Sequence, residues 1–460
     1  MKFKKNMILC AAVTDINNLG YGVAKIEGMT VFVSGAVDGD ECEVKLIKVN
    51  KNYCVGIVHR LITPSAYRTT SVCASSSKCG GCSYQNIDYM HELEIKRNYV
   101  MSAFKKAGLG QVTVNDTVSD MKTQGYRNKA QYPIDIIDGE YVIGFYASKS
   151  HRVISADGCT LQPEVFGFIC ERMKEFFSQY RLSVYDEQTG QGLLRHLYLR
   201  TSADRKNVML CLVINGTTTG HDRDLIEYVK TNMSDVTTLL LNVNCDNTNV
   251  VLGDKYITLF GDGYIKDVLC DVELEIAPAA FYQVNHDMAE RLYKKAAELA
   301  RLTGGETVYD LYCGIGSIGL SMHKLAGKIV GVDIEPSAIE CAKKNAKACG
   351  IDNAEFFCAD ASSTDNLFDG AGISGSLDGD IVIFDPPRKG SSEKLINYVC
   401  GKHSLRVVYI SCNPDTLARD SVYFINNGYM PSDVTPFDLF PRTGHCECVM
   451  CFEKQTMDRI

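Results

Sequence analysis

The chain of 460 residues lacks any hydrophobic run long enough to cross a membrane, and the apolar stretch after residues 1–6 is too short for a secretory signal. These absences favour a cytoplasmic protein without a membrane partner. Excess positive charge is also missing: the net charge is -8, which weakens the case for a nucleic-acid partner but leaves room for a local basic groove. Internal repeats and long low-complexity tracts are absent, so an ordinary globular architecture is expected.

The cysteines do not follow the pattern of a secreted, disulfide-rich protein. There are 20 of them, scattered along the chain and often single within apolar runs such as residues 209–213. Most are therefore expected to be buried apolar side chains. Hydrophobic residues make up 45% and charged residues 23%, as in soluble globular proteins, and the length predicts two or three domains.

Three domains are expected, at residues 1–63, 64–270 and 271–460. The first contains five short apolar stretches broken by glycine and aspartate, which predicts a small closed barrel of the OB type, although other small β-modules share this pattern. The second mixes helical and strand-like runs, so it is expected to be α+β. Within it, residues 88–109 carry apolar side chains at helical spacing, and this helix is a candidate to pack on the third domain.

A regular alternation of helices and strands begins near Ala277. A helix is expected over residues 285–302, and strands follow at 307–312, 328–333, 355–358, 381–384 and 407–410. This order predicts the α/β class, with a doubly wound, Rossmann-like parallel sheet. Because open sheets bind ligands beyond the carboxyl ends of their strands, residues that follow these strands are candidates for a site.

Two strand ends carry a nucleoside-binding pattern. The first leads into Gly314 and Gly316, which allow a tight turn and close backbone approach, and Asp333 at the end of the second suits a ribose diol. Gly319 completes the glycine spacing of dinucleotide-binding sites, so the spacing alone does not exclude NAD as the ligand. Residues 385–388, Asp-Pro-Pro-Arg, instead resemble the acidic-Pro-Pro motif of class I methyltransferases that use S-adenosylmethionine.

A cysteine follows the fifth strand at a turn, since Cys412 precedes Asn413 and Pro414. A thiolate that adds to C6 of a uracil ring makes C5 able to take a methyl group. The thiol must be ionised, which requires surroundings that lower its pKa. Glu447 is the candidate base for the C5 proton that leaves afterwards. The alternatives are a packed core thiol and a solvated glutamate.

Three cysteines lie close together in a loop rich in serine and glycine. Cys73, Cys79 and Cys82 suit a metal, and Cys159 is the best choice for a fourth ligand. Four thiolates suit an iron–sulfur cluster. Structural zinc is the rival, although only one C-x2-C pair is present.

Two further stretches mix cations with aromatic residues, a combination that suits RNA phosphates and unstacked bases. The candidate RNA-binding residues are Arg127, Lys129, Lys149, His151 and Arg152. Solvated charged loops are the alternative.

Together these motifs resemble the RNA uracil-5-methyltransferase family, particularly the bacterial 23S ribosomal RNA members with a TRAM domain and a [4Fe–4S] cluster. The resemblance spans nearly the whole chain. It is carried by the four-cysteine pattern and by residues 281–285, 310–316, 385–388, 411–414 and 440–447. A departure is Asp333, where members of the family often have glutamate.

The resemblance implies roles for individual residues. Cys412 would be the nucleophile and Glu447 the base. The cofactor S-adenosylmethionine would contact Gln283, Tyr312, Ser317, Asp333, Asp360 and Asp385, and the cluster would be held by Cys73, Cys79, Cys82 and Cys159. The N-terminal barrel would be a TRAM module. The barrel's own charges support RNA contact only weakly, and the target uridine would have to be extruded to reach the cysteine.

The sequence therefore predicts an enzyme that methylates C5 of a uridine in structured RNA, with 23S ribosomal RNA as the expected substrate and no obligate protein partner. The same reaction on transfer RNA is an alternative because relatives that act on it share the catalytic motifs. A second alternative is a non-catalytic protein of RNA-binding or redox-sensing function with an iron–sulfur cluster.

Overall fold

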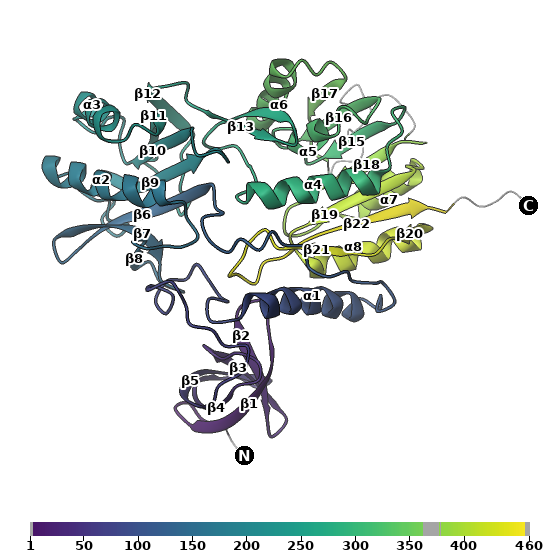
Figure 1. The fold of residues 1–460 in the computed structure, drawn as a ribbon, viewed down its shortest axis with the longest axis horizontal. Coiled ribbons are helices and arrows are strands. Elements are labelled where there is room, and N and C mark those ends of the chain that lie inside the picture. The colour runs from purple at the N-terminus through teal and green to yellow at the C-terminus, as the bar shows by residue number, and fades with distance from the viewer. Residues whose placement is uncertain (1–2, 362–376, 378, 456–460) are drawn as a thin grey trace, which may run out of the picture.

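The computed structural model describes residues 3–361, 377 and 379–455, which form a barrel, a central unit and a C-terminal unit (Figure 1). The barrel is closed, with strand order β1-β2-β3-β5-β4. Val31, Val33, Val44 and Leu46 alternate along their strands and are fully buried inside it. The strands are β1 (Ile8–Ile16), β2 (Tyr21–Ile26), β3 (Met29–Ser34), β4 (Glu41–Val49) and β5 (Tyr53–Thr63). The predicted barrel is confirmed.

The central unit is a seven-stranded sheet with the order β12-β11-β10-β9-β6-β7-β8. The helices α2 (Glu164–Tyr180) and α3 (Asp222–Asn232) cover one face, where Phe166 and Phe177 pack in one core with Leu210 and Leu212. Every residue of β10 is buried. The strands are β6 (Lys129–Ile137), β7 (Glu140–Tyr146), β8 (Val153–Ser155), β9 (Leu194–Thr201), β10 (Val208–Ile214), β11 (Val236–Val243) and β12 (Lys255–Phe260).

The C-terminal unit is the doubly wound α/β sheet that the sequence predicts. Its order is β17-β16-β15-β18-β19-β22-β20, with β21 beside β22. The parallel strands are β15 (Thr307–Leu311), β16 (Lys328–Asp333), β17 (Ala354–Cys358), β18 (Ile381–Phe384) and β19 (Arg406–Ser411). The antiparallel ones are β20 (Tyr429–Pro431), β21 (Thr435–Phe437) and β22 (Glu447–Lys454), after a separate hairpin of β13 (Ile265–Leu269) and β14 (Val272–Ile276).

The antiparallel edge differs from the expected purely parallel sheet. β22 has six consecutive buried residues, and a strand buried on both faces gives the same apolar run in either direction. Its pairing with β19 is therefore a property of the tertiary fold. This reversal matters for the site, because the start of β22 lies at the same edge as the end of β19.

Helices cover both faces of the C-terminal sheet. One core includes α4 (His286–Ala300), α5 (Ser317–Ser321) and α6 (Pro336–Ala348), and the other includes α7 (Glu393–Gly401) and α8 (Pro414–Asn426). The helix α1 (Tyr89–Lys106) joins the second core through Val100 and Phe104, and it lies beside α8 above the barrel (Figure 1). None of the helices in the described ranges combines the length and apolar character that a bilayer crossing needs.

Candidate active site

The nucleophile and base candidates meet at one edge of the C-terminal sheet. Cys412 follows β19, and β22 begins at Glu447. Ser411 pairs with Cys448 in the antiparallel register, so the two candidates are each one residue from a paired position. They also interact electrostatically, because the charge of Glu447 raises the pKa of Cys412. The structure thus brings together two residues from separate segments of the chain.

The turn at Cys412 is tied to the loop after β18. The Asn413 side-chain amide donates to the Arg388 carbonyl at 3.1 Å, and its oxygen accepts from the Asp415 backbone N–H at 3.1 Å to cap α8. The Ser411 hydroxyl accepts from the Asn413 N–H at 3.2 Å. These bonds hold the Asp-Pro-Pro-Arg loop and the cysteine turn in a fixed relation.

Burial and neighbouring carboxylates raise the pKa of both candidate residues. Burial raises the pKa of the Cys412 thiol to about 11, and Glu447 and Asp385 add to this, while Arg388 opposes it. Burial likewise raises the pKa of Glu447 to about 8, with Asp385 adding and Arg388 opposing. The expected lowering of the cysteine pKa is therefore wrong, because burial and two neighbouring carboxylates outweigh Arg388.

Two further carboxylates extend this acidic region. Asp310 is fully buried, and burial raises its pKa to about 7 although the Gly319 N–H donates to its Oδ2 at 2.8 Å. Its Oδ1 has no hydrogen-bond partner within the described structure. Burial and the charge of Asp310 raise the pKa of Asp385 to about 7. A cation bound among these groups would relieve their repulsion.

The loop after β15 forms an open cradle. Tyr312 and Gly314 have φ of 73° and 54°, in the left-handed region, and the Gly314 N–H donates to Asp333 Oδ2 at 2.9 Å. A Cβ on Gly314 would meet nothing within 4 Å, so this position faces open space. Gly319 differs, because its Cβ would lie 2.9 Å from Ile329. The third glycine of the dinucleotide-like spacing therefore serves packing within the sheet and α5.

The other predicted cofactor residues differ in their burial. Ser317 shares a hydrogen bond of 3.2 Å with the buried Tyr293 hydroxyl, whose pKa is raised by burial and then by Asp385. Gln283 is buried just before α4, and its carbonyl accepts from the Asn128 amide at 2.9 Å. Asp360 is exposed after β17. Tyr293 was missed because an aromatic residue in an amphipathic helix carries no sequence signal of a site.

A buried ion network supports the segment that leads to Glu447. Lys96 of α1 donates to Glu92 at 2.7 Å and to Asp438 at 2.6 Å. The Tyr89 hydroxyl donates to the other oxygen of Asp438 at 2.8 Å, and the Arg442 N–H donates to Glu92 at 2.8 Å. Burial alone would lower the pKa of Lys96, but the two carboxylates raise it, so the lysine stays charged. The network joins α1 to the approach to β22.

The four predicted cluster cysteines line one cavity of ≈ 190 Å³, together with Arg127 and Gln85. Among the described residues, however, no group of three or more His, Cys, Asp or Glu side chains is close enough to hold a metal ion. The cluster prediction is therefore not supported by the donor geometry. The shared cavity is formed by Cys73, Cys79, Cys82 and Cys159.

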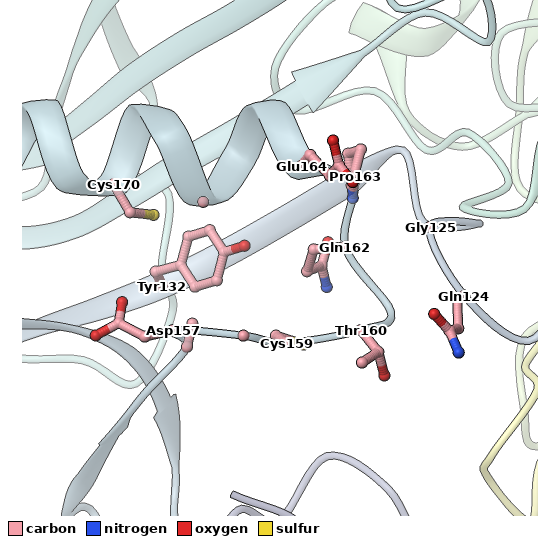
Figure 2. Close-up of a pocket in the computed structure, with 13 residues that line it drawn as sticks. Gln124, Gly125, Tyr132, Asp157, Cys159, Thr160, Gln162, Pro163, Glu164 and Cys170 are labelled. Carbon is pink, nitrogen blue, oxygen red and sulfur yellow. The ribbon is translucent and has the colours of Figure 1, made fainter. Parts of the chain in front are cut away.

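A second cavity of ≈ 540 Å³ adjoins the first, because Cys159, Thr160 and Gln162 line both. Figure 2 shows the Cys159 loop passing below α2, with the Tyr132 ring between them. The side-chain oxygens of Thr160 and Gln162 are buried without hydrogen-bond partners in the described structure. The cysteine loop thus separates two hollows of the central unit.

The five predicted RNA contacts fall into two groups. Arg127 and Lys129 lie at the start of β6, where burial, Arg200 and Arg127 lower the pKa of Lys129 to about 8. Lys149 is exposed at the β7–β8 turn and donates to the Tyr21 hydroxyl of the barrel at 2.9 Å. The same turn carries Arg152 and His151, which pairs with Glu187 at 2.9 Å. The predicted contacts thus do not form one continuous cluster.

The family model tRNA (Uracil-5-)-methyltransferase matches residues 88–455, and the TRAM domain model matches residues 6–58. The chain belongs to this methyltransferase family. The predicted family and its TRAM barrel are thereby confirmed, and the chain is an RNA methyltransferase.

Curated relatives extend over the full length of this methyltransferase. It is 37% identical over 454 residues to an uncharacterized RNA methyltransferase of Clostridium acetobutylicum, covering 98% of each chain. It is 38% identical over 447 residues to one of Clostridium tetani, covering 97% of this chain and 96% of the relative. The Pyrococcus abyssi tRNA (uracil-54, C5)-methyltransferase, solved with S-adenosyl-L-homocysteine, has 26% identity and a TM-score of 0.77, covering 96% of this chain and 100% of that chain.

Proposed function

We propose that this methyltransferase methylates C5 of a uridine in structured RNA, with 23S ribosomal RNA as substrate and S-adenosylmethionine as methyl donor. The observation that carries the proposal is the meeting of Cys412 and Glu447 beside an acidic cradle at the carboxyl edge of the sheet. A thiol and a carboxyl group at one edge supply the nucleophile and the base that substitution at C5 of uracil requires.

The residues at this edge fit S-adenosylmethionine. When bound, this cofactor supplies a methyl group on a positively charged sulfur. The orphaned Asp310 oxygen and the raised pKa values of Asp310 and Asp385 mark a region that favours a cation. Tyr312, Asp333 and Ser317 would hold the cofactor around the open Gly314 turn, with Gln283, Asp360 and Asp385 as further contacts.

The chain's own residues then have distinct tasks. The Cys412 sulfur forms a bond to C6 of the uracil as its thiolate, and the resulting electron density at C5 accepts the methyl group. Glu447 takes the proton from C5, and the bond between C6 and the sulfur breaks as the C5–C6 double bond returns. Arg388 is the cation beside both groups, and it lowers the pKa of each.

An iron–sulfur cluster in the cysteine cavity is part of the proposal. Four thiols line this cavity, and N–H groups donate to two of them: Gly81 to Cys79 at 3.4 Å and Gln85 to Cys82 at 3.5 Å. Such donors stabilise thiolates that bind iron.

RNA binding is supported by cations near the site. Arg127 lies close enough to Lys129 to lower its pKa, whereas Arg200 is buried and donates to the carbonyls of Ala277 and Ala280. Positive charge at Arg127 and Lys129 on an acidic protein suits a phosphate backbone. Transfer RNA is the second candidate substrate, because the structural relative from Pyrococcus abyssi is a tRNA methyltransferase by name.

The proposal can be tested by incubating the anaerobically purified protein with methyl-labelled S-adenosylmethionine and, separately, unmodified ribosomal and transfer RNA. We expect label in 5-methyluridine from ribosomal RNA, identified by mass spectrometry, and none with Cys412→Ala. Label only in transfer RNA would change the substrate. No label in either RNA would contradict the enzymatic proposal and favour a binding or redox-sensing protein.

A further inference from the structure

A third cavity, of ≈ 270 Å³, lies in the central unit apart from the active site and the cysteines. Its walls come from five chain segments: β6, the β7–β8 region, the loop before β9, the start of β9, and the loop after β11. The lining includes Tyr146, His151, Tyr185, Arg195, His196 and Asn249. Aromatic rings and hydrogen-bonding side chains thus share one small cavity.

Arg195 is a buried cation in this cavity. The residue is only 6% exposed. Its Nη1 donates to the Asn244 carbonyl at 2.7 Å, the Asn244 side-chain oxygen at 3.0 Å and the Asp246 carbonyl at 2.8 Å, and its Nη2 donates to the Thr248 carbonyl at 3.2 Å. No carboxylate pairs with it among the described residues, and its Nε has no hydrogen-bond partner. A buried guanidinium without an anion is costly, so a ligand with an acceptor atom would stabilise it.

His196 also has a ring nitrogen without a hydrogen-bond partner. Its Nδ1 is buried without a partner in the described structure. Burial and then Arg195 lower the pKa of this imidazole to about 4, so the ring is neutral at pH 7 and has one donor and one acceptor nitrogen. The imidazole and the Arg195 guanidinium thus line the same cavity.

The aromatic walls supply stacking surfaces. The Arg195 guanidinium lies 4.3 Å from the centre of the Tyr185 ring, and the Tyr146 and His151 rings are 5.4 Å apart. Bases of single-stranded RNA stack on such rings regardless of sequence, and hydrogen bonds to their edges then select among them.

Exposed cations lie beside the same cavity. Lys149 and Arg152 flank His151, and Lys149 reaches Tyr21 of the TRAM barrel. Arg152 has no carboxylate partner in the part of the chain that the structure describes. Phosphates of an RNA strand that passes between the barrel and the central unit could bind these cations while one base enters the cavity.

We infer that this cavity binds an unpaired nucleobase of the substrate RNA, away from the uridine that is methylated, and so helps to select the substrate. The inference rests on the proposed function to the extent that the substrate is RNA. The base must present an acceptor atom to Arg195, since guanidinium groups only donate.

The test uses the full-length protein with Tyr185→Ala, Tyr185→Phe and Asn249→Ala, with Tyr180→Ala as a matched control. Tyr180 is another half-buried tyrosine of this unit, packed on Phe176 and His221 outside the cavity. Unmodified transcripts of 23S ribosomal RNA and of transfer RNA serve as the probes. We expect Tyr185→Ala to raise Kd and KM for the bound RNA about tenfold with little change in kcat, as loss of a base stack does. Tyr185→Phe should bind like the wild type.

Asn249 is exposed, so Asn249→Ala keeps the test valid if Tyr185→Ala does not fold. We expect Asn249→Ala to weaken binding more than the control does. Photo-crosslinking of RNA that contains 4-thiouridine or 6-thioguanosine should also label the peptide around Tyr185.

Equal Kd values for the cavity variants and the control, with no crosslink near Tyr185, would overturn the inference even if 5-methyluridine forms. Conversely, RNA binding that depends on Tyr185 without any methylation would contradict the proposed function and leave the base-binding cavity standing.

Discussion

Two groups of buried charges lie on either side of the segment that leads to Glu447, and they differ in balance. In the network of α1, Glu92 and Asp438 meet Lys96 at 2.7 and 2.6 Å, and Arg442 completes the charge balance. In the proposed active site, burial raises the pKa of Asp310, Asp385 and Glu447, and Arg388 opposes this rise at Glu447.

This difference separates a structural site from a reactive one. A balanced buried network is satisfied in the folded protein, so removing one partner leaves an unpaired charge. In the unbalanced group, burial and neighbouring carboxylates raise the pKa of both Cys412 and Glu447, which is typical of a site that binds or reacts with a ligand.

The largest effect is expected for the nucleophile. Cys412→Ala should form no detectable 5-methyluridine, because no other group can make the bond to C6 of uracil. Nucleoside mass spectrometry measures the product. Cys245→Ala, which removes an exposed cysteine of the central unit, is the matched control and should retain wild-type activity. Product from Cys412→Ala would exclude this cysteine as the nucleophile.

The next largest effect is expected for the base. Glu447→Gln should lower kcat at least about 100-fold, because a glutamine cannot accept the C5 proton. The methylated adduct should accumulate, since its release depends on that proton transfer. Denaturing gels with radiolabelled RNA measure the adduct. Fast turnover by Glu447→Gln, without any accumulated adduct, would assign the base to another residue.

The balanced network is broken by Lys96→Met. Two buried carboxylates would remain without their shared cation, and we expect the free energy of unfolding to fall by about 3–5 kcal/mol. Urea denaturation measures this change. Lys294→Met removes an exposed lysine that pairs with Glu290 at 3.1 Å, and it should change stability by less than about 1 kcal/mol. Equal losses of unfolding free energy in the two variants would contradict the claim that the buried network stabilises the fold more than an exposed ion pair does.

The smallest effect concerns pH and stability. Because burial raises the pKa of Glu447 from 4.5 to about 8, the neutral group's contribution is fully present below pH 4.5 and is lost as the pH rises through about 8. Glu447→Gln should therefore match the wild type at pH 4.5 and be more stable than the wild type at pH 9. Stability curves at the two pH values would contradict this if the difference had the opposite sign.

Much of the fold and the position of the site were predictable from the sequence. Parallel strands place their carboxyl ends at one edge, so Asp333, Asp385 and Cys412 could be assigned to that edge from strand ends alone. Glu447 needed the family resemblance, because its place beside Cys412 depends on the antiparallel pairing of β22.

What the sequence did not reveal depends on tertiary contacts. The ion pair of Lys96 with Asp438 joins α1 to a distant loop, and neither residue belongs to a local motif that predicts it. The direction of the Cys412 pKa shift was missed for a similar reason: it reflects burial and the approach of Glu447 and Asp385 in the folded chain. The Arg195 cavity likewise combines five segments that carry no shared pattern.

The most direct test of the reactive site is to trap its adduct with RNA that contains 5-fluorouridine, in the presence of S-adenosylmethionine. Fluorine at C5 cannot leave as a proton, so the bond between the uracil and the enzyme should persist. We predict a stable protein–RNA complex whose crosslinked peptide contains Cys412. No adduct, or an adduct on a different residue such as the neighbouring Cys448, would contradict the account.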